Sequence, residues 1–326
     1  MRRSSLLILP IAGLAAAGTL AACGGEGGSD ADGLSVVAAF YPLAYATEQV
    51  GGDDVAVTNL TPAGQEPHDL ELAPSDIAAI EEADYVVYLK GFIPELDAAV
   101  EEYASDKALD VTTAVDTIGY DATQVFEDDH AHEEEAEEEE GEEHAHDEEL
   151  SGTDPHIWLD PVRYAQIGEA IADGLAGIDD ANADAYATAA DAFTADLTQL
   201  DAELTDALAG RTSDAIVTSH AAFGYLADRY GLTQVAISGL SPDQEPDTQR
   251  MAEVAHYVED NAVTTVFFET LVSPDIAETL AAETGAQTAV LNPLEGLTDE
   301  QSDDGDDYFT VMRENLAALQ TALGAA

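Results

Sequence analysis

Short apolar runs alternate with amphipathic stretches along most of this chain, which predicts strands that alternate with helices. Apolar runs typical of buried strands occur in the first half at residues 36–39, 55–60, 85–89 and 108–112. The second half repeats the pattern with runs at 215–218, 234–237, 263–268 and 289–291. Helical patterns that begin near Pro or end at Gly follow most of these runs, so we expect parallel sheets with helices on both faces.

The longest helical pattern lies between the two halves and predicts a rigid connection. Between residues 181 and 209 its apolar positions recur every three or four residues, at Tyr186, Ala190, Phe193, Leu197, Leu200, Leu204 and Leu208. A helix of this length spans about 40 Å, the width of a domain or more. We therefore expect an α/β fold with two Rossmann-like parallel-sheet domains, 34–178 and 211–326, joined by one long rigid helix at 179–210.

The first 33 residues have the features of an export signal followed by a tether. Two arginines precede an apolar run at 6–20 that is too short to span a membrane comfortably. Leu20-Ala21-Ala22-Cys23 looks like a bacterial lipobox, which predicts a signal peptide at 1–22 and lipid on Cys23. Residues 23–33 are rich in Gly, Ser and Asp and are typical of a flexible tether. The mature protein is thus expected at the outer face of the cell membrane.

Charge and cysteine content limit the possible partners. The chain has 9 basic and 68 acidic residues and a formal charge of -59, which excludes nucleic acid as a partner. The negative charges of such a surface repel one another at low salt, and counterions weaken this repulsion. The composition therefore suggests a saline or cell-wall environment. Cys23 is the only cysteine, so no intrachain disulfide can form. Nothing in the sequence suggests more than a monomer.

Residues 127–149 interrupt the pattern of strands and helices. They include 15 acidic residues and four histidines, His130, His132, His144 and His146. With almost nothing apolar to bury, this segment is expected to be a disordered, solvated loop. Either it is a charged spacer, or its imidazoles and carboxylates collect divalent transition metals weakly as an accessory metal loop.

Candidate metal ligands follow the expected strands. Ligands collect at the carboxyl ends of parallel strands, where loops open and helix N-termini point. His68 lies in the loop after the strand at 55–60, His220 follows the strand at 215–218, and Glu269 follows the strand at 263–268. His156 lies between two prolines just before a helix. Two of these residues come from each half, so the site is predicted in the cleft between the domains.

Three imidazoles and one carboxylate form a donor set suited to tetrahedral Zn²⁺. A manganese site would be expected to carry more oxygen and fewer imidazoles. Asp69, Asp154 and Asp160 are near enough in sequence to accept the second ring N–H of a ligating histidine, although the sequence does not say which one does. His256 falls within a helical pattern and is interpreted as a surface or packing residue.

At these residues the chain resembles the metal-binding lipoproteins of ABC importers for zinc and manganese, the cluster A-I solute-binding proteins, and especially their zinc branch. The resemblance runs from about Leu34 to the C-terminus. It rests on six motifs in order: Phe40-Tyr41-Pro42-Leu43, Glu66-Pro67-His68-Asp69 with Pro74-Ser75-Asp76, Asp154-Pro155-His156-Ile157-Trp158-Leu159-Asp160-Pro161, Ser219-His220-Ala221-Ala222-Phe223-Gly224-Tyr225, Phe267-Phe268-Glu269 and Leu291-Asn292-Pro293-Leu294.

The resemblance implies a zinc-binding protein rather than an enzyme, with the metal held between two domains for delivery to a membrane permease and its ATPase. It also implies the ligands His68, His156, His220 and Glu269. Manganese and iron binders of the family tend to have a carboxylate where this chain has His220. Some zinc members place a carboxylate just before the first histidine, whereas here Pro67 is there, which leaves the fourth ligand open.

Three alternatives remain. A manganese or iron binder of the same fold is one. Another is a zinc hydrolase in which Glu269 activates a metal-bound water. An adhesin, or a chaperone that delivers zinc to other wall proteins, is the third.

Overall fold

The computed structural model describes residues 33–121 and 151–325. All described residues belong to one compact unit, Gly33–Ala326. The predicted signal peptide, Cys23 with its lipid, and the loop at 127–149 with His130, His132, His144 and His146 lie outside the described residues. Within the described ranges, no helix has both the length and the apolar character needed to cross a membrane.

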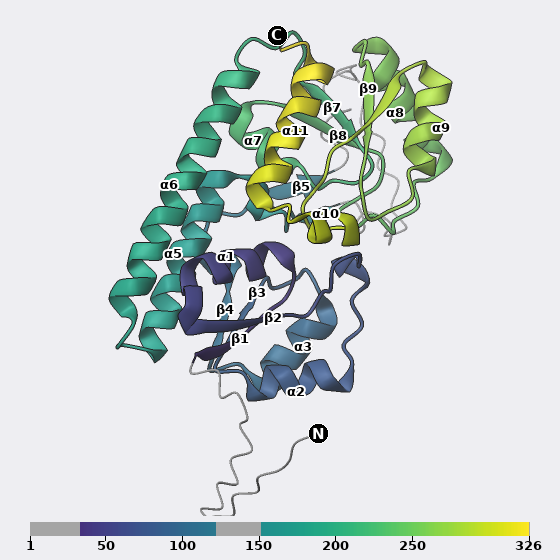
Figure 1. Cartoon of the computed structure of the whole chain (residues 1–326). Helices are drawn as coiled ribbons and strands as arrows, with labels where there is room; N and C mark the ends of the chain where they lie inside the picture. The colour runs from purple at the N-terminus through teal and green to yellow at the C-terminus, as the bar shows by residue number, and fades with distance from the viewer. Residues whose placement is uncertain (1–32, 122–150, 326) are drawn as a thin grey trace, which may run out of the picture. The chain divides into compact units, whose positions relative to one another are not determined.

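Four parallel strands form the first sheet: β1 (Leu34–Ala38), β2 (Val55–Asn59), β3 (Tyr85–Tyr88) and β4 (Ala108–Asp110), in the order β2-β1-β3-β4. Three helices follow the first three strands: α1 (Tyr41–Gly51), α2 (Pro74–Glu82) and α3 (Pro94–Tyr103). Each has a proline in its first two positions, where the fixed φ suits a helix start. Helix α1 lies on one face of the sheet and α2 and α3 on the other (Figure 1). We call this sheet with its helices the N-terminal lobe.

The second sheet repeats this topology. Its strands are β7 (Ala215–Thr218), β8 (Thr233–Ala236), β9 (Thr265–Phe268) and β10 (Gln287–Val290), all parallel, in the order β10-β9-β7-β8. Its helices are α7 (Gly224–Tyr230), α8 (Thr248–Asp260), α9 (Asp275–Thr284), α10 (Asp299–Asp304) and α11 (Tyr308–Leu323). We call this part the C-terminal lobe. The prediction of two parallel-sheet domains is confirmed.

Two antiparallel helices, α5 (Pro161–Ile178) and α6 (Ala183–Leu208), run along both lobes (Figure 1). Asp160 caps α5, since its Oδ1 accepts the N–H groups of Val162 and Arg163 at 2.8 and 3.4 Å. Helix α6 packs against α5 and α1, and also against α7 and α11 of the C-terminal lobe. The two lobes are therefore joined through a shared helical layer, and the predicted boundaries at 178 and 211 stay predictions.

One face of α6 is buried along the length of the helix. All seven predicted apolar positions are buried: Tyr186, Ala190, Phe193, Leu197, Leu200, Leu204 and Leu208. Each leucine contributes about 1.5–3 kcal/mol by its removal from water. One apolar cluster continues from the N-terminal sheet across α5 and α6 to α11, while a second lies within the C-terminal lobe.

Three features differ from the predicted pattern. Helix α7 begins at Gly224 rather than Ala221, because the N–H of Ala221 donates to the carbonyl of Gly239 at 2.8 Å instead of entering the helix. Helix α10 was not predicted. Strands β5 (Gly119–Asp121) and β6 (Ser151–Thr153), which also were not predicted, form an antiparallel pair.

Candidate metal centre

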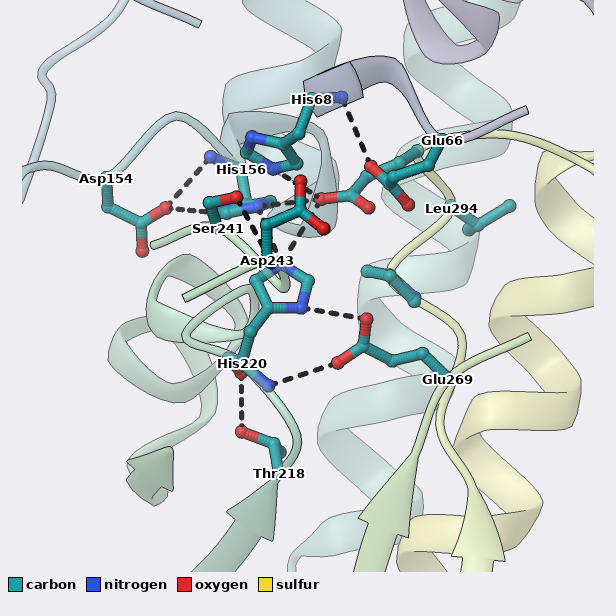
Figure 2. A network of polar contacts seen from close by, with 12 residues as sticks. Glu66, His68, Asp154, His156, Thr218, His220, Ser241, Asp243, Glu269 and Leu294 are labelled. Carbon is teal, nitrogen blue, oxygen red and sulfur yellow. Dashed lines mark hydrogen bonds and ion pairs between the residues drawn. The ribbon is translucent and has the colours of Figure 1, made fainter. Parts of the chain in front are cut away.

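Four side chains from separate loops converge between the lobes. The donor atoms of His68, His156, His220 and Glu295 all lie within 4.8 Å of one another. His68 and His156 come from the N-terminal side, and His220 comes from the C-terminal lobe (Figure 2). Glu295 follows β10 of the same lobe. Three imidazoles and one carboxylate therefore meet, as the sequence predicted, but the carboxylate in this group is Glu295 rather than Glu269.

His68 lies on a short 3-10 helix, η2 (Pro67–Asp69), that follows β2. The side chain of Glu66 accepts the backbone N–H of His68 at 3.3 Å. The imidazole packs edge-on against Phe92, with ring centroids 4.4 Å apart. With these contacts 9% of the His68 side chain is exposed, more than for His156, His220 or Glu295. His68 therefore lies at the solvent side of the centre.

His156 precedes the 3-10 helix η4 (Ile157–Leu159) and is fully buried. Asp154 Oδ1 accepts from the backbone N–H of His156 at 2.9 Å and lies 2.8 Å from its Nδ1. A carboxylate on Nδ1 holds the proton there and leaves Nε2 as the metal-binding nitrogen. Of the three acids considered from the sequence, Asp154 has this role, while Asp160 caps α5 and Asp69 lies near Asp243.

His220 follows β7 and is also fully buried. Its backbone N–H donates to Glu269 Oε1 at 3.1 Å, and its Nδ1 lies 2.7 Å from Glu269 Oε2. The hydroxyl of Thr218 donates to the carbonyl of His220 at 2.7 Å. Glu269 does follow β9 directly, as predicted, but it contacts the far side of the ring. It orients His220 and does not belong to the converging group.

Glu295 lies five residues after the end of β10 and is 1% exposed. Its Oε1 is 3.2 Å from His68 Nε2, 2.9 Å from His156 Nε2 and 3.3 Å from His220 Nε2. Its Oε2 is buried without a hydrogen-bond partner among the described residues. Sequence reasoning missed Glu295 because it is not at a strand end, although it immediately follows the motif Leu291-Asn292-Pro293-Leu294.

The spacing of the donor atoms suits a small tetrahedral ion. Ligands bound at about 2.0–2.1 Å in a tetrahedron lie about 3.3–3.4 Å from one another. The three Nε2–Oε1 distances of 2.9–3.3 Å and the 3.3 Å between the Nε2 atoms of His156 and His220 are close to this value. Four of the six distances between donor atoms are thus close to those of a tetrahedral Zn²⁺ site, and all six are within 4.8 Å.

Burial and charge set the proton occupancy of the centre. Burial alone would lower the pKa of His156 and His220, but the hydrogen bonds and charges of their carboxylate neighbours outweigh it and raise both. Burial would raise the pKa of Glu295, but the charge of His220 and hydrogen bonds from the histidines lower it well below the usual range. Burial lowers the pKa of His68. Metal must therefore displace protons from two of the imidazoles.

Glu66 adds a second carboxyl group beside the centre (Figure 2). Burial, and then the charge of Glu295, raise its pKa to about 9. It is therefore protonated at neutral pH in the metal-free protein.

A separate pocket of about 440 Å³ borders Asp154 and Pro155, and none of the four converging residues lines it.

With this geometry established, comparison with known proteins identifies the family. The family described as "Zinc-uptake complex component A periplasmic" matches residues 36–322. The chain belongs to this family. The resemblance inferred from the motifs is thereby confirmed.

Curated relatives carry names that agree with the family. The chain is 38% identical over 325 residues to "Zinc-binding lipoprotein AdcA" of Streptococcus pneumoniae strain R6, covering 98% of this chain and 61% of that protein. It therefore spans less than two thirds of the length of that relative. The "High-affinity zinc uptake system protein ZnuA" of Bacillus subtilis is 37% identical over 310 residues, 93% of each chain.

Solved structures share the fold. The Zn(II)-bound ZnuA-like domain of Streptococcus pneumoniae AdcA has a TM-score of 0.71 and 34% identity, and the match covers 89% of this chain and 99% of that one. The laminin-binding protein Lmb of Streptococcus agalactiae, described as having adhesin and metal transporting activity, has a TM-score of 0.73 and 30% identity over 89% of this chain and all of the other.

Proposed function

We propose that this protein captures Zn²⁺ outside the cytoplasm and delivers it to an ABC importer made of a permease and an ATPase. The observation that carries the proposal is the convergence of three imidazole Nε2 atoms and one carboxylate oxygen at tetrahedral spacing. Membership of a zinc-uptake family supports the same metal and the same task.

The proposed ligands are His68, His156, His220 and Glu295. Glu269, the carboxylate ligand predicted from the sequence, takes instead the role of a partner that orients His220. Asp154 has the same role toward His156. The burial of the Glu295 carboxylate supports a cation here, because a buried negative charge is costly unless a positive charge lies near it.

The proposal is capture rather than catalysis. A hydrolase would need a base that faces a metal-bound water. Glu269 was the candidate for that base, and its two oxygens contact the backbone N–H and Nδ1 of His220, on the side away from the converging donors. With Glu295 as fourth donor, the metal would be coordinatively closed, which is typical of sites that hold zinc rather than activate water.

We also propose that the mature chain begins at Cys23 and is anchored by lipid to the outer face of the membrane as a monomer. The names of relatives described as lipoproteins support the anchor. The test is metabolic labelling of cells with a radioactive fatty acid. Label on the wild-type chain but not on Cys23→Ala supports it, whereas label on both places the lipid elsewhere.

The test of the metal site is a competitive titration of the metal-free protein with Zn²⁺ and Mn²⁺ against a chromophoric chelator. We expect one tight zinc site that is retained when residues 127–149 are deleted and is lost in His220→Ala. His256→Ala is the matched control, because His256 is exposed on α8, outside the converging group. Preference for Mn²⁺ would indicate a manganese binder, and loss of all tight binding with the deleted loop would place the site there.

A further inference from the structure

The turn that carries Glu295 has an unfavourable backbone conformation. Residues 291–294 connect β10 to Glu295, and Leu294 has φ = +57°, in the left-handed region that side chains other than Gly, Asn and Asp rarely adopt. Leu291 and Leu294 are fully buried. Such a conformation persists only where surrounding contacts hold it, and these places concentrate at functional sites.

A pair of asparagines supplies those contacts. Two hydrogen bonds join the side chain of Asn315, on α11, to the backbone of Asn292. Asn315 Oδ1 accepts from the N–H of Asn292 at 2.8 Å, and Asn315 Nδ2 donates to the carbonyl of Asn292 at 2.7 Å. Asn292 Oδ1 in turn accepts from the N–H of Leu294 at 2.7 Å. Through Asn292, the side chain of Asn315 therefore holds the backbone of Leu294, the residue before Glu295.

The arrangement costs stability at one atom. Asn292 Nδ2 is buried without a hydrogen-bond partner among the described residues, and both asparagines are 3% exposed. Burying an unpaired donor is unfavourable, so an apolar residue would serve the core better than Asn292. The side-chain oxygen of Asn292 explains why an amide is present at this position, because it accepts the N–H of Leu294.

Trp158 ties the same turn to the other lobe. Its indole N–H donates to the carbonyl of Pro293 at 2.7 Å, and its ring centroid is 5.4 Å from that of His156. The hydroxyl of Tyr308, the first residue of α11, donates to the carbonyl of Trp158 at 2.7 Å. Helix α11 therefore contacts both the turn with Glu295 and the segment with His156.

We propose that Asn315 is a positioning residue for zinc and determines selectivity: it fixes the turn so that Glu295 Oε1 is placed for a short bond in a tetrahedral site. This inference rests on the proposed role of Glu295 as a ligand. A turn held at both ends cannot easily move outward for a larger ion that prefers more oxygen ligands, so its rigidity favours Zn²⁺ over Mn²⁺.

The test compares Asn315→Leu, which keeps a similar volume and removes both hydrogen bonds, with Leu319→Ala one turn further along α11. Leu319 is fully buried and has no polar group, so its truncation lowers stability without removing a hydrogen bond. Zinc and manganese affinities are measured by competitive titration and stability of the metal-free proteins by thermal unfolding. Asn315→Ser repeats the test if the leucine variant does not fold.

We expect Asn315→Leu to weaken zinc binding about 10–100-fold, the usual effect of losing a residue that orients a ligand, and to weaken manganese binding less. Leu319→Ala should keep the zinc affinity of the wild type. Trp158 is the only tryptophan, so the emission of the metal-free protein should change in the Asn315 variants and not in Leu319→Ala.

Wild-type zinc affinity in the folded Asn315 variants, or an equal loss in Leu319→Ala, would overturn the inference. Glu295→Ala in the same titration separates this result from failure of the proposed function. If Glu295→Ala weakens zinc binding and the Asn315 variants do not, only the positioning role is wrong. If Glu295→Ala binds zinc like the wild type, the proposed ligand set itself is wrong.

Discussion

Glu269 and Glu295 contact opposite nitrogens of one imidazole: Glu269 Oε2 lies 2.7 Å from Nδ1 of His220, and Glu295 Oε1 lies 3.3 Å from its Nε2. A carboxylate at each nitrogen keeps His220 protonated in the metal-free protein. If a metal took the place of the proton at Nε2, the N–H at Nδ1 would still donate to Glu269. Two glutamates of the same charge therefore have different roles, one on each side of the ring.

This difference predicts unequal effects of two matched substitutions. Glu295→Gln removes a proposed ligand charge, whereas Glu269→Gln leaves all four donors and weakens only the orientation of His220. We expect Glu269→Gln to lower zinc affinity about 10–100-fold and Glu295→Gln to lower it more. Competitive titration of both variants measures the order, and a larger loss in Glu269→Gln would restore Glu269 as the ligand.

Zinc affinity should rise with pH through the neutral range. The raised pKa values of His156 and His220 mean that both hold protons above the ordinary histidine value of about 6.5, so zinc must displace them. Affinity should therefore begin to fall at a higher pH than an ordinary imidazole site would. Calorimetric titration in two buffers of different ionisation enthalpy measures the released protons, and a pH-independent affinity down to about pH 5 would contradict an imidazole site.

The metal-free protein should show the opposite slope. A histidine whose pKa is raised on folding stabilises the fold below about pH 6.5, and this contribution is lost as pH rises through the raised value. Glu66, with its pKa raised to about 9, acts in the same direction, while His68, whose pKa is lowered, opposes them below pH about 6.5. Thermal unfolding with chelator should thus show stability falling between about pH 6.5 and 9, where ordinary surface carboxylates no longer titrate.

A glycine at the start of α7 should affect the metal centre through Asp154. A Cβ built on Gly224 would lie 2.1 Å from Asp154 Oδ2, so Gly224→Ala must displace the carboxylate that orients His156. We expect about a 10-fold or greater loss of zinc affinity. Gly177→Ala, in α5 with open space around the added carbon, should leave affinity unchanged and stabilise the helix by up to about 1 kcal/mol. Equal zinc affinities in the two variants would contradict this role of Asp154.

Replacing His220 by a carboxylate should reduce the preference for zinc. His220→Asp exchanges an imidazole for an oxygen donor, which suits Mn²⁺ better than Zn²⁺. We expect zinc affinity to fall and the ratio of zinc to manganese affinity to decrease, as measured by titration with both ions. An unchanged ratio would mean that this position does not determine selectivity.

Salt should stabilise the fold. The formal charge is -59, and cations are few, so repulsion between carboxylates is large at low ionic strength. Several arginines are already engaged, such as Arg229 with Asp201 and Arg313 with Glu203. We expect the melting temperature to rise with NaCl concentration, because counterions screen the repulsion between carboxylates. A melting temperature that falls in salt would contradict this interpretation of the composition.

The strands and the long helix could be predicted because their signal is local. Alternating apolar runs located β1 and β7, and the spacing of Phe193 and Leu197 located α6, since burial of one face depends only on periodicity. His68 and His220 could be placed by the strand-end rule, because the carboxyl ends of parallel strands meet at one edge, whereas His156 was selected by its place in the loop before a helix.

The carboxylate that lies among the three histidines could not be predicted in this way. The rule of strand ends selects Glu269, which does follow β9, but distance along the chain does not say which nitrogen of His220 a carboxylate reaches. Glu295 depends on a left-handed turn at Leu294 and on contacts with Asn315 and Trp158, which are far away in sequence. Helix α7 was predicted too long for a similar reason, because the N–H of Ala221 pairs with Gly239 across a loop.

The four proposed ligands are spread over most of the chain, since His68 and Glu295 are 227 positions apart, and the turn before Glu295 is held by α11. The proposed site therefore cannot be complete in a growing chain until α11 has been made and has docked on the turn before Glu295. Under the proposal, zinc loading is thus a late step of folding, which follows the docking of α11.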